Sequence, residues 1–134
     1  VGLGNTGGSV AERLHGWGMR VIACDPYVSA EKAALLHVEL VDLPTLLQEA
    51  DVVSLHTPVT SETRNLIDEA QLRMMKPTAL LINIARGPLV QYDALHAALT
   101  SGHLAGAGLD EGKHLVLLHQ PAAHAPFEHR LPAG

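Results

Sequence analysis

The first eight residues carry a glycine pattern that could bind phosphate groups. Gly2, Gly4 and Gly7 form G-x-G-x-x-G, and a helical run follows them. In a dinucleotide site the first glycine makes a tight turn, the second lets backbone amides approach the pyrophosphate, and the third lets helix and strand pack closely. The amino terminus of the helix adds unpaired N–H groups and partial positive charge. The pattern therefore predicts a dinucleotide-binding loop.

A carboxylate follows at the distance that suits the ribose of such a dinucleotide. Asp25 comes 18 residues after Gly7, at the end of the apolar run 20–24. There it can accept hydrogen bonds from the adenosine ribose hydroxyls, whereas it would repel a 2′-phosphate. This arrangement predicts NAD rather than NADP. The other interpretation is that Asp25 and Pro26 only end a strand, since both residue types favour turns.

Short β-rich runs alternate with helical patterns and must position these residues. We expect strands at 20–24, 38–41, 51–56, 78–84 and 104–109. We expect helices at 6–16, 29–36, 44–49, 68–75 and 91–100. Ser29 and Asp68 are candidate N-caps of two of them. Most of the strands are nearly continuous apolar runs, as in a parallel sheet that is buried on both faces. The predicted fold class is α/β, a Rossmann-type doubly wound parallel sheet that is truncated at its first strand.

The chain is expected to divide at Asp110. Residues 1–110 are predicted to form a dinucleotide-binding domain, and almost all of its first strand would precede Val1. Without that strand, backbone groups of two neighbouring strands would be unpaired. Residues 111–134 contain three prolines, four histidines and no helical period. We predict a divergent, poorly specified tail there.

Composition limits the class of protein. The 134 residues suffice for one domain, and a hydrophobic content of 47% argues against a disordered chain. A formal net charge of −5 without any basic run argues against a nucleic-acid partner. The single Cys24 fits a reducing compartment, and the sequence shows neither a signal pattern nor a membrane-length apolar run. We therefore expect a cytoplasmic protein without a membrane partner.

Five successive segments resemble the D-isomer-specific 2-hydroxyacid dehydrogenases. They are VGLGNTG, VIACDPY, ADVVSLHTPVTSETRNLI, MKPTALLINIARGPLV and SGHLAGAGLD, and together they run from Val1 to Asp110. The 3-phosphoglycerate dehydrogenase and the glycerate or hydroxypyruvate reductase branches look most similar. The resemblance implies NAD as cofactor and hydride transfer between nicotinamide and C2 of a small 2-hydroxy or 2-keto acid. It also implies a second, substrate-binding domain outside this chain and a homodimeric full-length enzyme.

The resemblance assigns cofactor contacts by position. It implies Asn5 and Thr6 at the pyrophosphate, Asp25 with Pro26 at the ribose, Thr57, Pro58 and Thr63 at the adenosine, Ile84 and Ala85 at the nicotinamide, and Asp110 at its ring or carboxamide. Many family members have Arg-Ile where this chain has Asn-Thr, so backbone amides must neutralise the phosphates here.

Arg86 matches the substrate-binding arginine of the family and is the catalytic residue that the resemblance implies. A planar, permanently charged fork of donors suits the carboxylate and carbonyl oxygens of a 2-keto acid. Outside this motif, an arginine at a strand end is usually a solvated or salt-bridged surface residue.

The acid–base pair of the family has no match in register. Its glutamate would fall at Leu115, Glu111 is too close to Asp110, and His129 is the nearest candidate for its histidine. We therefore expect the chain itself to be inactive, with either a reading-frame error or genuine divergence after Asp110. Two other functions stay open: an NAD-sensing Rossmann module without catalysis, and an inactive remnant that barely folds.

The remaining histidines predict no metal site. Four of them recur every five residues in the tail, namely His114, His119, His124 and His129. On a helix this spacing turns about 140° per step, so no face would collect them. The others are scattered and are expected to be surface or hydrogen-bonded core residues: His15, His37, His56, His96 and His103.

Overall fold

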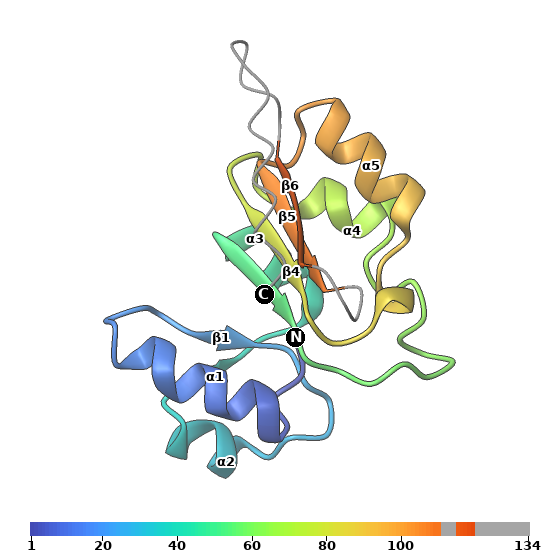
Figure 1. Cartoon of the computed structure of the whole chain (residues 1–134). Helices are drawn as coiled ribbons and strands as arrows, with labels where there is room; N and C mark the ends of the chain where they lie inside the picture. Colours follow the sequence, from blue (N-terminus) through green and yellow to red (C-terminus); the bar gives the residue numbers. More distant parts are fainter. Residues whose placement is uncertain (111–114, 120–134) are drawn as a thin grey trace, which may run out of the picture.

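A computed structural model describes residues 1–110 and the backbone of residues 115–119. Its strands form two sheets (Figure 1). The smaller sheet pairs β1 (Ile22–Ala23) in parallel with β2 (Glu39–Leu40). The larger sheet has the order β3 (Val52–Leu55), β4 (Leu80–Asn83), β5 (Gly106–Asp110) and β6 (Leu115–His119). In it β3, β4 and β5 run parallel, and β6 is antiparallel to β5.

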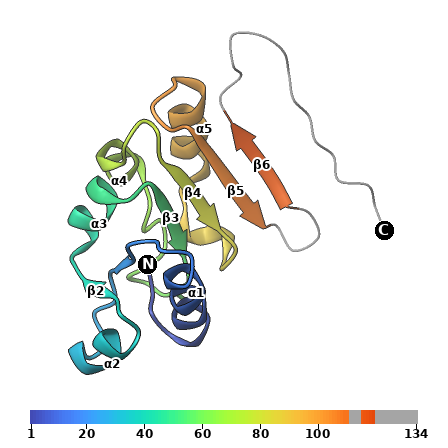
Figure 2. The same ribbon diagram turned by 90° about the vertical axis from the view of Figure 1, so that its left-hand side faces the viewer.

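Helices connect the parallel strands. They are α1 (Asn5–His15), α2 (Ala30–Leu35), α3 (Leu43–Glu49), α4 (Glu69–Met74), α5 (Tyr92–Thr100) and the short 3-10 helix η1 (Gly87–Leu89). Figure 2 shows α3, α4 and α5 along the larger sheet, whereas α1 and α2 lie beside β1 and β2. Among the described residues no helix has the length and apolarity needed to cross a membrane.

Side-chain caps fix where three of these helices begin. The Ser29 hydroxyl accepts from the Lys32 amide at the start of α2. Asp68 forms a capping box with Gln71 at the start of α4. Both caps were expected. The helix α3 begins at Leu43, one residue before the predicted start, and Asp42 caps it. Each cap satisfies amide groups that the first helical turn leaves without partners.

The first residues join the two sheets. The Val1 nitrogen donates to the Ser54 carbonyl at 2.7 Å, and the His56 amide donates to the Val1 carbonyl at 2.8 Å. The Gly2 amide donates to the Cys24 carbonyl on the other side at 3.0 Å. Residues 1 and 2 therefore lie between β1 and β3.

Two apolar cores match the two sheets. The larger core packs α3, α4 and α5 against β3, β4 and β5, and its fully buried members include Leu47, Leu55, Leu72, Leu81 and Leu95. The smaller core consists of Leu3, Ala11, Ala23, Ala33 and Val38. Val1 packs at the edge of the larger core. The amino-terminal segment is thus shared by both cores.

Several element boundaries differ from the prediction. β1 has two residues instead of five, because among the described residues it pairs with β2 alone and a groove lies on its other side. The predicted strand 104–109 is displaced to Gly106–Asp110. No strand was predicted after Asp110, yet Leu115–His119 forms β6. The apolar run LVLLH suits a short strand, but helical periodicity alone does not reveal such a run.

Candidate functional site

A cleft of about 550 Å³ lies at the carboxyl ends of β3 and β4, beside the start of α1. Its lining includes the predicted site residues Thr6, Thr57, Pro58, Ile84, Ala85 and Arg86. In parallel α/β sheets, ligands bind outside the carboxyl ends of the strands. The cleft therefore has the location that a dinucleotide would require.

The glycine loop is closely packed on one side and open on the other. Gly2 has a φ of +86°, and a Cβ there would lie 2.7 Å from the His56 carbonyl oxygen. A Cβ on Gly7 would overlap the carbonyl oxygen of Gly2. At the exposed Gly4, in contrast, an added Cβ would meet no atom within 4 Å. The space beside Gly4 is therefore available to a ligand that approaches the backbone closely.

The first turn of α1 presents donors to that space. Gly4 is its N-cap residue and supplies no side-chain hydrogen bond, and the turn contains no acidic residue. Asn5 and Thr6 are exposed. Since the first amides of a helix have no intrahelical partner, this turn can bind an anion. The geometry fits a pyrophosphate that is held by backbone amides, as the Asn-Thr pair predicts.

Asp25 is fixed by the backbone on both sides. Its Oδ2 accepts from the Leu3 amide at 2.8 Å, and its Oδ1 accepts from the Tyr27 amide at 2.9 Å. Each carboxylate oxygen can accept a further hydrogen bond. Asp25 therefore stabilises the glycine loop in this structure and keeps acceptor capacity for ribose hydroxyls. Pro26 is exposed beside it.

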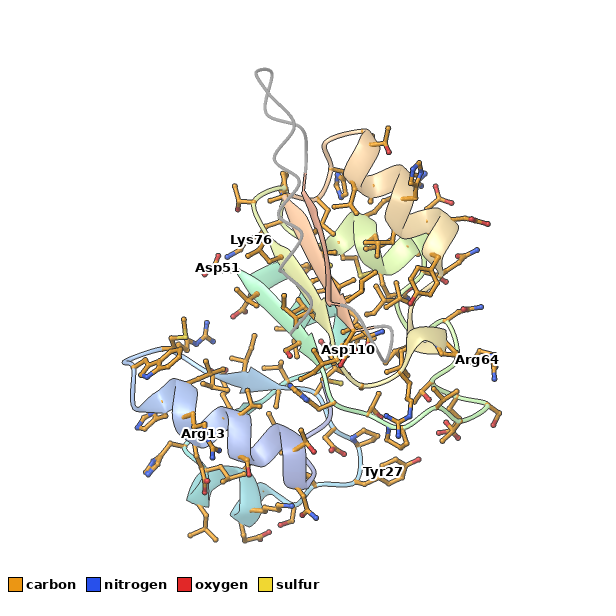
Figure 3. All side chains as sticks on the ribbon, viewed as in Figure 1. Arg13, Tyr27, Asp51, Arg64, Lys76 and Asp110 are labelled. Carbon is orange, nitrogen blue, oxygen red and sulfur yellow. The ribbon has the colours of Figure 1, made fainter. Side chains whose placement is uncertain are left out.

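The loop after β3 is held by threonine hydroxyls. Thr63 donates through Oγ1 to the Pro58 carbonyl at 2.7 Å and accepts from the Thr60 amide at 2.7 Å. Across from this loop, the Tyr27 hydroxyl donates to the Glu62 carboxylate at 3.2 Å, which raises the pKa of Tyr27. Figure 3 shows Tyr27 on the chain that follows β1. Thr63 thus shapes the predicted adenosine side, and Thr57 and Pro58 line the cleft.

Arg86 lies in the cleft with most of its donors available. It is exposed, and among the described residues its guanidinium makes a single hydrogen bond, from Nη1 to the Ala85 carbonyl at 2.7 Å. None of the ion pairs within these residues includes it. The exposed Ile84 stands two residues earlier. An exposed apolar side chain and a guanidinium without an ion pair among the described residues therefore both line the cleft at the end of β4.

Asn83 positions this segment, and it was not among the predicted site residues. It is the buried polar residue of the core described here, 2% exposed. Its Nδ2 donates to the Arg86 carbonyl at 2.8 Å, and its Oδ1 accepts from the Ala85 and Arg86 amides at 3.2 and 3.3 Å. A polar residue inside the apolar run LLINIA was the available signal, because buried amides need such partners.

Asp110 ends β5 at the same edge of the larger sheet (Figure 3). Its neighbour Leu109 is in register with Asn83, which in turn is in register with Leu55. Asp110 is exposed, and it does not line the cleft. The sheet register therefore brings Asp110 to the same edge of the sheet as Arg86.

The histidines within residues 1–110 have structural surroundings. His56 Nε2 is 2.9 Å from the Ser54 hydroxyl, while its Nδ1 is buried without a hydrogen-bond partner. Burial, with the Val1 ammonium nearby, lowers the pKa of His56. His103 bonds the Leu72 carbonyl, and the exposed His15 and His37 stack. His96 is exposed. These findings match the expectation of surface or core roles, except at the Nδ1 of His56.

The residues considered for acid–base chemistry fall in the carboxyl-terminal segment. Leu115 begins β6 and pairs with Asp110, and His119 ends β6 opposite Gly106. Glu111, His114, His124 and His129 lie outside the described residues. Among the described residues, no group of three or more His, Cys, Asp or Glu side chains could hold a metal ion.

Comparisons with known proteins show which family the chain matches. The family model of the D-isomer specific 2-hydroxyacid dehydrogenase, NAD binding domain, matches residues 1–129. The chain belongs to this family. It superposes on a D-isomer specific 2-hydroxyacid dehydrogenase from Lactobacillus delbrueckii ssp. bulgaricus in its NAD-complexed form, with a TM-score of 0.77 and 48% identity. That superposition covers 81% of this chain and 32% of the other. These matches confirm the predicted Rossmann-type α/β fold.

Curated relatives of this family member are much longer. D-3-phosphoglycerate dehydrogenase from Mycobacterium bovis is 45% identical over 127 residues, which are 95% of this chain and 23% of that protein. Glyoxylate reductase from Korarchaeum cryptofilum is 49% identical over 110 residues, which are 82% of this chain and 33% of that protein. The chain spans a quarter to a third of such relatives. The mycobacterial match continues past Asp110, the residue at which the resemblance was expected to end.

Proposed function

We propose that this chain is the NAD-binding part of a dehydrogenase that interconverts a small D-2-hydroxy acid and its 2-keto acid. The observation that supports it most is the shared cleft: the first turn of α1, the exposed Ile84 and the guanidinium of Arg86 face one space. A pyrophosphate, a nicotinamide ring and a carboxylate need an anion site, an apolar wall and a fixed cation, respectively. The cleft offers the three side by side.

Each part of the cofactor has a matching group in this proposal. The α1 amides bind the pyrophosphate, Gly4 lets it approach, and Asp25 accepts hydrogen bonds from the ribose. Thr57, Pro58 and Thr63 border the adenosine. Ile84 and Ala85 border the nicotinamide, and Asp110 contacts its ring or carboxamide. Gly2 and Gly7 fold the loop.

Arg86 would hold the substrate and Asn83 would hold Arg86. The guanidinium can bind two oxygens of a 2-keto acid in a bidentate manner, and Asn83 fixes the backbone on which it stands. When bound, NAD supplies the hydride acceptor of the reaction. The chain itself orients the substrate through Arg86, whose positive charge stabilises the negative charge on the substrate oxygens.

Binding experiments test the cofactor part of this proposal. We expect the chain to bind NAD saturably in calorimetry, and at least about tenfold more tightly than NADP, because the Asp25 carboxylate opposes a 2′-phosphate. Equal or tighter NADP binding would overturn the assignment of Asp25, and no NAD binding at all would overturn the assignment of the cleft.

Kinetics test the substrate part. In a complete dehydrogenase that carries this domain, Arg86→Lys should lower kcat/KM at least about tenfold, since an ammonium lacks the bidentate geometry, while NAD affinity stays unchanged. Arg64→Lys, at an exposed arginine of the loop after β3, is the matched control. Unchanged kinetics for Arg86→Lys would contradict the substrate-binding role of Arg86.

The isolated chain should not oxidise NADH with hydroxypyruvate, glyoxylate, pyruvate or phosphohydroxypyruvate. The reason is that Leu115 stands where the resemblance implies a glutamate, and general acid–base groups contribute typically 10² to 10⁴-fold. Turnover that His129→Ala abolishes would contradict this expectation and show that the carboxyl-terminal segment is catalytic.

The proposal also covers the division of the chain, the oligomeric state, the location and the partners of the protein. We place the dinucleotide-binding domain at residues 1–110 and a divergent segment at 111–134. We further propose a homodimeric enzyme of the cytoplasm, on the grounds of the resemblance and the single Cys24. The partner is a small-molecule acid, with neither a nucleic acid nor a membrane involved.

A further inference from the structure

Two loops of the chain border the predicted adenosine side of the cofactor site. One follows β1 and contains Asp25 and Pro26, and the other follows β3 and contains Thr57, Pro58 and Thr63. The first loop leaves the smaller sheet, and the second leaves the larger sheet. A contact between these loops therefore spans the space that is assigned to the adenosine.

A side-chain hydrogen bond makes this contact. The Tyr27 hydroxyl in the first loop donates to the Glu62 carboxylate in the second loop at 3.2 Å, across 35 residues of sequence. Figure 3 shows Tyr27 extending from the chain that follows β1. Tyr27 is 84% exposed, so burial contributes little to the position of its ring. The bridge between the loops therefore depends on this exposed hydrogen bond.

The Tyr27 end of the bridge is anchored beside the predicted ribose carboxylate. The Tyr27 amide donates to Asp25 Oδ1 at 2.9 Å, and Asp25 Oδ2 accepts from the Leu3 amide at 2.8 Å. The same carboxylate thus fixes the glycine loop and the backbone from which the Tyr27 ring extends. The bridge consequently starts at the ribose side of the site.

The Glu62 end is anchored in a turn that threonine hydroxyls stabilise. The Glu62 amide donates to Thr60 Oγ1 at 3.2 Å. The Thr60 amide donates to Thr63 Oγ1 at 2.7 Å, and Thr63 Oγ1 donates to the Pro58 carbonyl at 2.7 Å. Bonds of this kind between hydroxyls and nearby backbone groups stabilise turns. The backbone of Glu62 is therefore held next to Pro58 and Thr63, two of the predicted adenosine contacts.

The bridge can open without a rearrangement of either loop. Tyr27 and Glu62 are both exposed, and exposed side chains change rotamer within picoseconds to nanoseconds. The charge on the acceptor strengthens the hydrogen bond and raises the pKa of the Tyr27 phenol, so the hydroxyl keeps its proton at neutral pH. The pair thus has a closed arrangement that is favoured and an open one that is accessible.

We propose that Tyr27 and Glu62 form a clasp over the adenosine half of the NAD site, which must open before that half can enter or leave. The inference rests on the proposed cofactor site. Because the clasp spans the opening and does not itself hold the cofactor, it slows entry and exit by the same factor. Loss of the clasp therefore raises both rate constants of binding and leaves the dissociation constant unchanged.

Stopped-flow fluorescence of NADH with the whole chain tests the clasp. Tyr27→Phe is the decisive variant, because it removes the hydroxyl and keeps both the ring and the net charge. We expect the association and dissociation rate constants of NADH each to rise about three- to tenfold, with a dissociation constant within about twofold of the wild-type value. ADP-ribose, which carries the adenosine without the nicotinamide, should show the same acceleration in competition with NADH.

A double variant shows whether the two side chains act as a pair. Glu62→Ala removes the acceptor and should raise both rate constants as Tyr27→Phe does. The double variant should be no faster than Glu62→Ala, because the same hydrogen bond is lost in each case. Glu12→Ala, at an exposed position of α1, removes an equal charge and should leave both rate constants within about twofold. Circular dichroism checks that each variant is folded.

Three outcomes would overturn the clasp and leave the cofactor site intact, since NADH still binds to the wild-type chain in each of them. The first is a Tyr27→Phe variant with unchanged rate constants. The second is a dissociation constant that rises together with the dissociation rate constant while association is unchanged, because the hydroxyl would then contact the cofactor. The third is an additive acceleration in the double variant. A folded wild-type chain that does not bind NADH would instead overturn the cofactor site and the clasp together.

Discussion

The unit built on β3 to β6 and the unit built on β1 and β2 are held together differently. The first has a continuous ladder and a large leucine-rich core, while the second has two-residue strands and a core of five mostly small residues. Val1 to Leu3 join them. The proposed phosphate and ribose contacts belong to the smaller unit, and the proposed nicotinamide and substrate contacts belong to the larger one. Because the smaller unit has the smaller core, cofactor binding should stabilise it more than it stabilises the larger unit.

The largest contrast is expected from truncating the two cores. Leu81 is fully buried in the larger core, so Leu81→Ala should lower the free energy of unfolding by about 2–5 kcal/mol. Val38→Ala removes fewer carbons from the smaller core and should cost about 1–2 kcal/mol. Urea unfolding followed by circular dichroism measures both. A larger cost for Val38→Ala would reverse the comparison.

Removing the Asn83 side chain tests how the larger unit holds its part of the cleft. Asn83→Ala leaves the Ala85 and Arg86 backbone groups without partners and should destabilise the fold by about 1–3 kcal/mol. Hydrogen exchange at the Ala85 and Arg86 amides should accelerate. Gln48→Ala, at an exposed position of α3, is the control and should change neither quantity appreciably.

Asp25 tests the smaller unit in the same way. Asp25→Ala should weaken NAD binding and narrow the NAD-to-NADP affinity ratio by about tenfold, or about 1.4 kcal/mol. The loss of its bonds to the Leu3 and Tyr27 amides should also loosen the glycine loop. Calorimetry with both cofactors measures the ratio, and Asp93→Ala on α5 controls for net charge. An unchanged ratio would show that Asp25 only supports the loop.

The sequence predicted those features that depend on local chemistry. Ser29 and Asp68 cap helices as expected, and the glycine pattern marked the loop that packs against His56. Features that depend on how the chain turns or pairs beyond a segment were not predicted. Asn83 looked like one polar residue in an apolar strand, and its role requires the turn that follows.

The strand boundaries show the same limitation. The run 20–24 has the composition of a strand, but a residue counts as paired only where a neighbouring strand lies beside it. β1 has β2 on one side and the groove on the other, so its ladder is short. β6 was not predicted, because its apolar run lacks a helical period and its strand partner β5 could not be identified from that run alone. In the structure β5 pairs with it.

The central claim is that one cofactor molecule spans both units. Titration of NAD into the chain, followed by amide NMR shifts, tests it most directly. We predict that the amides of Asn5 and Thr6 in the smaller unit and of Ala85 and Arg86 in the larger unit shift together, with one common dissociation constant. Shifts confined to one of the two units, or two separate dissociation constants, would contradict the account.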